Sequence, residues 1–396
     1  SIPKYIENIN ENNHQRQIVG ESVSGKSIIF ESNHNPLHIA AETGNRGALD
    51  ILAAKGASIN YQSGTGSIAL HLAIMTGQLK LISPLLDKGS SVNLPDKHNN
   101  TPLHYIVQTS ELSMIKDIVD NRKIYIIRNN LGQSPLDIAT IQNREDILDL
   151  LLTKSLPGNN ISIQEYMQMP FFNAVFTGQM KIARCLMKHG ANINGILNNA
   201  TVLCKAALGG HIKIVDLLLR KGADPNIRVN GKMNALSFAV IVENIEIIRL
   251  LLRHNVELVD SDHDGNGCLI KAILDENKEI VDILLQRGVN VNARNNYGAS
   301  AMHFAAAIGN IDLIHTLLKY KGDVNVKNNE GGTPLHVAVL YERKKAIEFL
   351  IRNGADCTIA AQGLVPFMLM KLPIQEVPRF RKFIIRPLIQ GKVFLT

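Results

Sequence analysis

Apolar residues recur along this chain with the spacing of short amphipathic helices. Many segments place apolar residues three and four positions apart, which puts them on one face of a helix. Two examples are Ile214, Leu217 and Leu218, and Ile280, Ile283 and Leu284. Helices of about ten residues are marginal alone because nucleation is costly. Each predicted helix must therefore bury its apolar face against neighbouring helices.

The predicted helices follow a longer repeat of about 33 residues. Its clearest copy is Thr333-Pro334-Leu335-His336-Val337-Ala338. The histidine position of that copy, called the histidine slot below, is occupied along the chain by His38, His71, His104, Asp137, Phe172, Cys204, Ser237, Ile270, His303 and His336. The intervals are 33 residues except for one of 35 and one of 32. Such regularity predicts a single supersecondary unit repeated ten times in an all-α solenoid.

The Thr-Pro-Leu-His-x-Ala signature, and endings such as Gly222-Ala-Asp-Pro-Asn226, resemble the ankyrin repeat family over about residues 34–370. The resemblance implies ten helix-turn-helix repeats with β-hairpin tips over 34–363. Residues 1–33 are then an N-terminal cap segment, and 364–396 a partial repeat with a C-terminal cap. It also implies that the recurring histidines support the backbone of their own repeat and the next. The family binds other proteins through the concave face of the first helices and the hairpin tips.

Local signals agree with this arrangement. Thr333 before Pro334 predicts a helix start, because the hydroxyl caps free amides and proline loses no bond at the first position. That helix is expected to end near Tyr341. Glycines are expected to end several first helices in the left-handed conformation. They are Gly44, Gly77, Gly178, Gly209 and Gly309.

The turns between repeats are polar and rich in Asn, Asp and Gly, so they predict a row of exposed tips. Tyrosine and arginine there are favoured contacts, because aromatic and guanidinium groups dominate binding hot spots. The predicted partner-binding residues are Tyr61, His98, Asn99, Arg228, Asn230, His263, Arg294, Asn295, Tyr297, Asn328 and Glu330. The partners are expected to be proteins, whose identity the sequence does not specify.

The net charge of +7 is concentrated at one end of the chain. Residues 371–396 hold six Lys and Arg side chains against one Glu. The repeats show no basic stripe of the kind that nucleic-acid binding requires, so no nucleic-acid partner is expected. No run of 18 apolar residues predicts a membrane span. Ser1 without a preceding methionine suggests a processed product or a piece of a longer protein. A cytoplasmic location is favoured, or a secreted one if the chain is part of a toxin.

One segment matches a nucleotide-binding motif. Gly20 to Ser27 satisfies the phosphate-loop pattern G-x-x-x-x-G-K-[ST], in which Lys26 would contact phosphates and Ser27 would hold magnesium. A phosphate loop needs a strand before it and a helix after it. Asn33, Asn35 and Pro36 would end such a helix early. We therefore interpret the segment as a polar capping loop.

Other candidate chemistry is weaker. Asp260 to Gly265 copies the opening of a calcium loop, but its twelfth position is Lys271 where a glutamate is required. Cys185, Cys204, Cys268 and Cys357 lie far apart without a Cys-x-x-Cys pair, so neither a disulfide framework nor a zinc site is expected. A repeat array offers no enclosed pocket in which to build a catalytic set. The sequence predicts a non-enzyme with no cofactor and no metal.

The interior copies depart from the pattern. The segment from about Leu156 to Gln168 is expected to be a longer loop, arising by drift or serving as a special recognition site. In the tail, Phe380 to Arg386 faintly resembles the first helix of the SOCS box, which recruits a ubiquitin-ligase scaffold.

Three functional readings follow. The first is a protein-binding scaffold or adaptor. The second is the repeat section of a larger effector or latrotoxin-like toxin. The third is a nucleotide-binding protein that uses Gly20 to Ser27.

Overall fold

The computed structural model divides the chain into two compact units. Unit 1 comprises Ser1–Ala174 and Lys181–Ala191, and unit 2 comprises Val175–Met180 and Asn192–Thr396. The residues that the structure describes are 18–21, 27–30, 33–109, 112–154, 156–157, 162–229, 233–258, 265–361 and 363–366.

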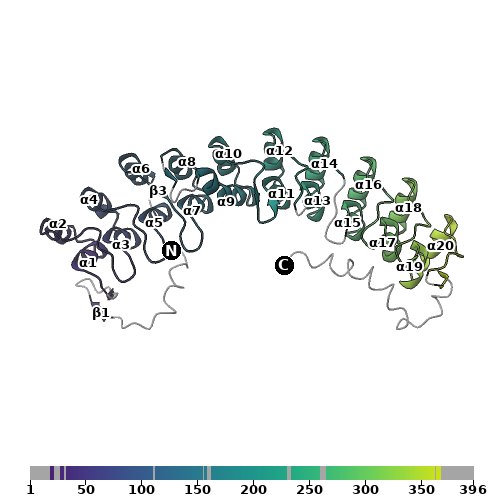
Figure 1. Ribbon diagram of the computed structural model, residues 1–396, viewed down its shortest axis with the longest axis horizontal. Coiled ribbons are helices and arrows are strands. Elements are labelled where there is room, and N and C mark those ends of the chain that lie inside the picture. Colours follow the sequence, from purple (N-terminus) through teal and green to yellow (C-terminus); the bar gives the residue numbers. More distant parts are fainter. Residues whose placement is uncertain are drawn as a thin grey trace. The chain divides into compact units, whose positions relative to one another are not determined.

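Within each unit, helices alternate between two layers (Figure 1). The first helices of the repeats are α1 Pro36–Glu42, α3 Ala69–Met75, α5 Pro102–Thr109, α7 Pro135–Ile141, α9 Ile163–Phe176, α11 Val202–Leu208, α13 Ala235–Ile241, α15 Cys268–Leu274, α17 Ala301–Ile308 and α19 Pro334–Leu340. The second helices are α2 Arg46–Ala54, α4 Ile82–Asp87, α6 Leu112–Asn121, α8 Glu145–Lys154, α10 Met180–Lys188, α12 Ile212–Arg220, α14 Ile245–Arg253, α16 Lys278–Gln286, α18 Ile311–Lys319 and α20 Lys344–Arg352. A 3₁₀ turn, η2 Leu79–Leu81, precedes α4. The all-α repeat architecture predicted from the sequence is confirmed, and α19 ends one residue before the predicted Tyr341.

Strands in the described residues are short. β1 Ile18–Glu21 pairs antiparallel with β2 Ser27–Phe30. β3 Tyr125–Ile126 pairs parallel with β4 Leu156–Pro157, and β5 Ile196–Leu197 pairs antiparallel with β6 Ala200–Thr201.

The core lies between the two layers and between neighbouring first helices. In α17 every side chain from Ala301 to Ala307 is buried. Small residues such as Ala305 and Ala306 let α17 lie close to α15 and α19, with which it packs. The second helices bury only one face, for example Ile247, Ile248 and Leu251 in α14. This asymmetry explains why only the second helices show a strong amphipathic pattern.

The recurring histidines join consecutive repeats, as the resemblance implied. The Nδ1 atom of His303 accepts a hydrogen bond from the Ser300 amide at 3.1 Å, and its Nε2 atom lies 3.0 Å from the Gly332 carbonyl. Since Nδ1 accepts, Nε2 carries the proton and donates, so the ring is neutral. His38, His71, His104 and His336 repeat this geometry. His336 reaches the Leu364 carbonyl, so the described start of the predicted partial repeat docks on the tenth repeat.

Asparagines at the ends of the repeats form a second set of links. Asn292 accepts from the Asp323 amide at 2.8 Å and donates to the Lys321 carbonyl at 3.2 Å. Asn60, Asn226 and Asn325 make equivalent bonds. Each link spans about one repeat, so it holds only adjacent units together.

The glycine predictions are right at four of five positions. Gly44, Gly77, Gly178 and Gly309 are left-handed, with φ between 73° and 84°. Gly209 was predicted to be left-handed and is not, because it caps α11 with φ −73°. The following Gly210 has φ 72° and makes the reversal instead.

The long loop predicted from Leu156 to Gln168 is wrong in its extent. Leu156 and Pro157 pair with β3, and α9 already begins at Ile163. The Ser162 hydroxyl accepts from the Glu165 amide at 3.3 Å, so Ser162 and Glu165 have the spacing of a capping box. This cap extends the helix by two turns before Pro170.

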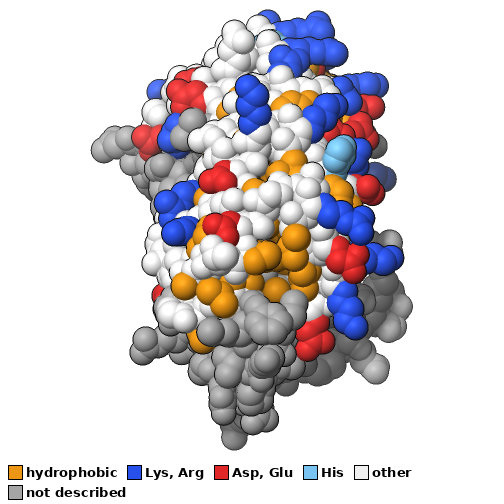
Figure 2. Space-filling model, turned by 90° about the vertical axis from the view of Figure 1, so that its right-hand side faces the viewer, with side chains coloured by type: hydrophobic (Ala, Val, Ile, Leu, Met, Phe, Trp, Pro, Cys, Tyr) orange, Lys and Arg blue, Asp and Glu red, His pale blue; other side chains and the backbone are white. Residues whose placement is uncertain are grey.

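The end of unit 2 formed by α19 and α20 carries apolar side chains between charged borders (Figure 2). Leu340, Ile347 and Leu364 pack around the buried Val339 and Ala361. Repeat arrays must cover such a face at their last unit. This agrees with a C-terminal cap in 364–396, which stays a prediction, and Phe380 to Arg386 lie outside the described residues.

Candidate protein-binding surface

An apolar residue ends most of the first helices. In unit 2 the residues four positions after the histidine slot are Phe176, Leu208, Ile241, Leu274, Ala307 and Leu340, which we call the helix-end row. All except Ala307 are the last residue of their helix. Phe176 is 46% exposed, and Leu208, Ile241, Leu274 and Leu340 are partly exposed. Helix ends next to a turn normally carry polar residues, so this row is unusual.

The helices that carry the helix-end row pack side by side, and the row is interrupted only at Ala307, which is buried. Contacts join α11 to α13, α13 to α15, α15 to α17, and α17 to α19. At the start of the row, the Phe176 carbonyl lies 2.8 Å from His211 Nε2, and Lys205 Nζ lies 5.5 Å from the centre of the Phe176 ring. Unit 1 has equivalents in Met75 and Ile141, 40% and 58% exposed. Exposed apolar residues in one register form a candidate interaction surface.

Three glutamates lie two positions after the row residues of their repeats. Glu243, Glu276 and Glu342 are exposed and left-handed, with φ 52°, 55° and 56°. A side chain in this conformation costs about 1 kcal/mol relative to glycine. Glu243 Oε2 accepts from Asn277 at 2.8 Å, and Glu276 Oε2 accepts from Asn310 at 3.0 Å. These amides are neutral, so they do not offset the negative charges of Glu243 and Glu276 beside the apolar row.

The predicted tip residues differ in exposure. Tyr61, His98, Arg228 and Arg294 are exposed, while Asn99, Tyr297 and Glu330 are partly buried. Arg228 pairs with Glu257 at 2.6 Å, and Arg294 donates to the Gly298 carbonyl at 2.9 Å. Asn230 and His263 lie outside the described residues.

Asn295 and Asn328 are buried, so the structure does not support them as contacts. Asn295 Oδ1 accepts from the amides of Tyr297 and Ala299 at 3.0 and 2.9 Å, and its Nδ2 donates to Asn266. Asn328 accepts from the amides of Glu330 and Gly332. Each closes its own turn through an Asx bond and becomes buried in doing so.

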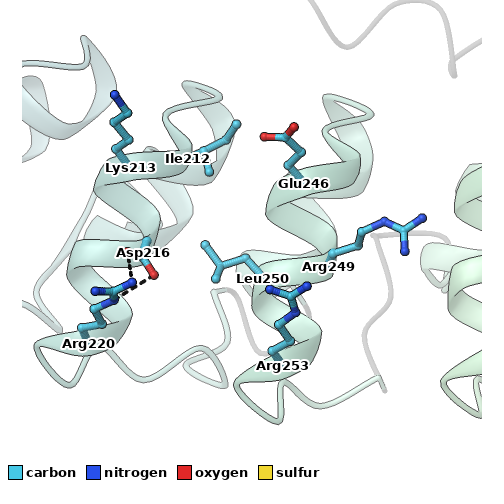
Figure 3. Close-up of a pocket in the computed structure, with 8 residues that line it drawn as sticks. All are labelled: Ile212, Lys213, Asp216, Arg220, Glu246, Arg249, Leu250 and Arg253. Carbon is cyan, nitrogen blue, oxygen red and sulfur yellow. Dashed lines mark hydrogen bonds and ion pairs between the residues drawn. The ribbon is translucent and has the colours of Figure 1, made fainter.

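The second helices carry a groove of different character. Side chains from α12 and α14 line an open hollow of about 380 Å³ (Figure 3). Six of its eight lining residues are charged, and Asp216 pairs with Arg220 at 2.9 Å inside it. Its lining contains no Ser, Cys or His nucleophile. This groove does not assemble a catalytic set.

The two sequence motifs weighed above have the wrong surroundings. Ser27 begins strand β2, which pairs with β1, so the phosphate-loop pattern joins two antiparallel strands. A phosphate loop leads from a strand into a helix. At the calcium-like segment, Lys271 lies in α15 with its ammonium group 2.7 Å from Asp275. Ser22 to Lys26 and Asp260 to Asp264 lie outside the described residues.

The architecture defines a class of proteins in which stacked helix-turn-helix units present a long binding surface. The sequence model described as "Ankyrin repeats (3 copies)" matches residues 9–96, 70–165, 156–229, 228–295 and 277–361. The chain belongs to the ankyrin repeat family. Repeats of this family are protein interaction modules, and none of the described helices is long and apolar enough to cross a membrane.

Sequence reasoning missed the helix-end row. A signal for it exists, because the fourth residue after the slot is Met, Ile, Phe or Leu in seven of the ten copies. The sequence does not show that these residues end their helices and are partly exposed, because their exposure depends on where each helix ends.

Proposed function

We propose that this chain is a non-enzymatic protein-binding scaffold whose main contact surface is the helix-end row of unit 2. The observation that supports this is the register of Phe176, Leu208, Ile241, Leu274 and Leu340 at the ends of packed first helices. Each partly exposed side chain offers apolar area whose burial contributes about 25 cal/mol per Å². A partner that covers the row gains from each repeat except the ninth, whose Ala307 is buried.

The charges beside the row define the partner further. Glu243, Glu276 and Glu342 favour a partner segment that carries basic side chains next to its apolar ones. Arg294 and Tyr297, on a tip of the same unit, extend the surface with an arginine and an aromatic ring. The scaffold function is also compatible with a place inside a larger effector or toxin.

The test compares captured proteins. The double variant Ile241→Gln/Leu274→Gln removes the centre of the row, and Arg294→Ala/Tyr297→Ala removes a tip. Ile351→Gln is the matched control, since Ile351 in α20 is 46% exposed and lies outside the row. Partners captured by the wild type and quantified by mass spectrometry should drop at least tenfold with the row variant and remain with the control. A partner set unchanged by both surface variants contradicts the proposal.

A further inference from the structure

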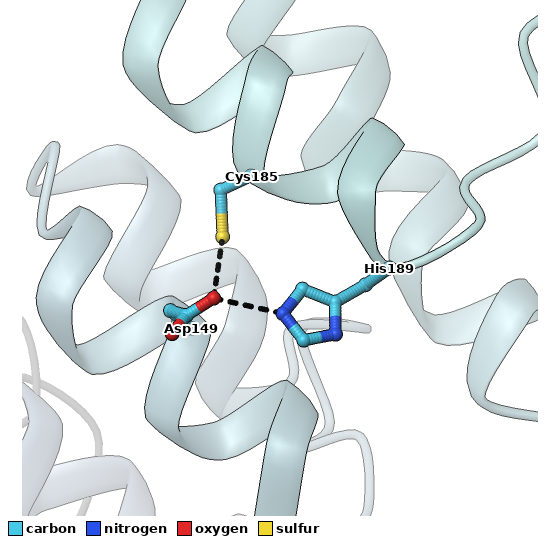
Figure 4. A group of neighbouring side chains, drawn as sticks. All are labelled: Asp149, Cys185 and His189. Carbon is cyan, nitrogen blue, oxygen red and sulfur yellow. Dashed lines mark hydrogen bonds and ion pairs between the residues drawn. The ribbon is translucent and has the colours of Figure 1, made fainter.

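Three side chains with metal-binding atoms meet between α8 and α10 in unit 1 (Figure 4). Asp149 Oδ1 lies 2.8 Å from His189 Nε2 and 3.8 Å from Cys185 Sγ. The three atoms lie within 4.8 Å of one another. The sequence predicted no zinc site, because its cysteines lie far apart without a Cys-x-x-Cys pair. The residues of this cluster come from helices of two adjacent repeats.

Helix geometry explains how the cluster forms. Cys185 and His189 are four residues apart in α10 and at its C-terminal end, so they share one face. That face packs towards α8, from which Asp149 projects. Glu145 lies four residues before Asp149 on the same helix. Burial raises the pKa of the Cys185 thiol to about 12, and the charges of Asp149 and Glu145 add to this effect. The pair Glu145 and Asp149 in α8 therefore faces the pair Cys185 and His189 of α10.

The donor types and distances suit zinc. Zinc bonds of about 2.3 Å to sulfur and 2.0–2.2 Å to nitrogen and oxygen give tetrahedral edges of roughly 3.3–3.7 Å. The sulfur–oxygen distance of 3.8 Å is close to such an edge. The oxygen–nitrogen distance of 2.8 Å is that of a hydrogen bond and would open by about half an ångström. Thiolate with imidazole favours zinc over magnesium or calcium.

Exposure and competing contacts permit an ion to enter. Cys185 is buried, whereas the Asp149 side chain is 43% exposed, so the cluster opens to solvent on one side. Lys188 Nζ also lies 3.0 Å from Asp149 Oδ1, but the Lys188 side chain is 69% exposed. Such an exposed ion pair is weak, because solvent screens the two charges. A divalent cation would displace the Lys188 ammonium group into solvent.

We propose that Asp149, Cys185 and His189 bind a zinc ion, with water in the fourth position, as a structural clamp between α8 and α10. The repeats it would join have Asp137 and Phe172 in the histidine slot, so they lack the bridging histidine that five of the ten repeats carry. The clamp would supply a link between repeats in this part of unit 1. On binding, the Cys185 proton passes to solvent and the thiolate bonds to zinc.

The test is a cobalt titration of the full-length reduced chain carrying Cys357→Ser, which removes the exposed thiol. We expect one equivalent of Co²⁺ to produce a thiolate-to-cobalt charge-transfer band and visible bands of tetrahedral intensity, both abolished by Zn²⁺. Cys185→Ser should remove the charge-transfer band, while the matched control Cys204→Ser, a buried thiol in α11, should keep it. His189→Gln should weaken cobalt binding at least about tenfold.

Zinc should also raise the melting temperature of the wild type and leave that of His189→Gln unchanged. Circular dichroism shows whether each variant is folded. If Cys185→Ser is not folded, the result for His189→Gln decides the test. No charge-transfer band in the wild type, or an equal band in a folded Cys185→Ser variant, overturns the proposal. The first outcome would leave the cluster as an ion pair that joins two helices.

Discussion

At the scale of single residues, burial controls the charge of the bridging histidines. His71, His104 and His303 each donate to a carbonyl of the next repeat. Burial lowers the pKa of each of these rings to about 4. The unfolded chain, with a histidine pKa near 6.5, therefore binds protons that the folded chain excludes. Stability is fully present above about pH 6.5 and falls as the pH drops towards 4.

We predict a loss of about 2 kcal/mol of unfolding free energy per buried histidine between pH 7 and pH 5. Urea denaturation at the two pH values measures it. Between pH 7 and pH 5, the variant His303→Gln should lose about 2 kcal/mol less unfolding free energy than the wild type. His254→Gln, which changes an exposed ring, should lose as much as the wild type. An equal pH dependence in His303→Gln and wild type would show that His303 does not exclude protons.

The roles of single residues were partly predictable from the sequence. The histidines were placed correctly because their neighbours form a recognisable signature. Asn295 and Asn328 were placed wrongly because polarity was taken as exposure. Both are followed three positions later by a left-handed glycine, Gly298 or Gly331. That Asn-x-x-Gly spacing indicates a side chain that turns inward to hold its own loop.

At the scale of elements, the tips pack closely enough to require glycine at some positions. Gly298 has φ 73°, and a Cβ atom there would lie 2.7 Å from the Asn329 amide nitrogen of the next tip. Gly288 has φ 86°, but a Cβ atom there would have nothing within 4 Å. The two glycines share the backbone conformation and differ in the space around them.

Gly288→Ala should therefore cost about 1 kcal/mol from backbone strain alone. Gly298→Ala should cost roughly 2–4 kcal/mol, because backbone atoms of the neighbouring tip must also move. Urea denaturation of the two variants gives the comparison directly. Equal losses in the two variants would mean that adjacent tips are not in close contact.

Helix boundaries show where pattern reasoning reaches its limit at this scale. The start of α19 was predicted because Thr333 and Pro334 form a sharp signal. The start of α9 was missed because Pro170 resembles the first residue of a helix. Here the cap at Ser162 and Glu165 begins the helix earlier, and proline is tolerated in the interior. A local cap can thus outweigh the repeat period.

At the scale of the whole molecule, the period of 33 residues was enough to predict the class of fold. A repeated unit packs mainly against its neighbours, so its architecture follows from one copy. The helix-end row and the cluster of Asp149, Cys185 and His189 were not predictable in this way. Both arise where side chains of different repeats come together, and their geometry depends on packing that no single copy encodes.

Because each repeat packs mainly against its neighbours, a substitution in one repeat should destabilise mainly the adjacent repeats. His303→Ala removes two buried hydrogen bonds, one within the ninth repeat and one to the tenth, and should cost about 2–4 kcal/mol. Helices α15 to α20 depend on that link most directly, whereas α1 to α4 belong to unit 1 and are linked by the bridging bonds of His38 and His71. Hydrogen exchange followed by mass spectrometry should show amides of α15 to α20 exchanging roughly thirtyfold faster. The exchange rates of amides in α1 to α4 should be unchanged. In His71→Ala the amides of α1 to α4 should exchange faster, and those of α15 to α20 should be unchanged. Equal acceleration along the whole chain in both variants would show instead that the array unfolds as one cooperative unit.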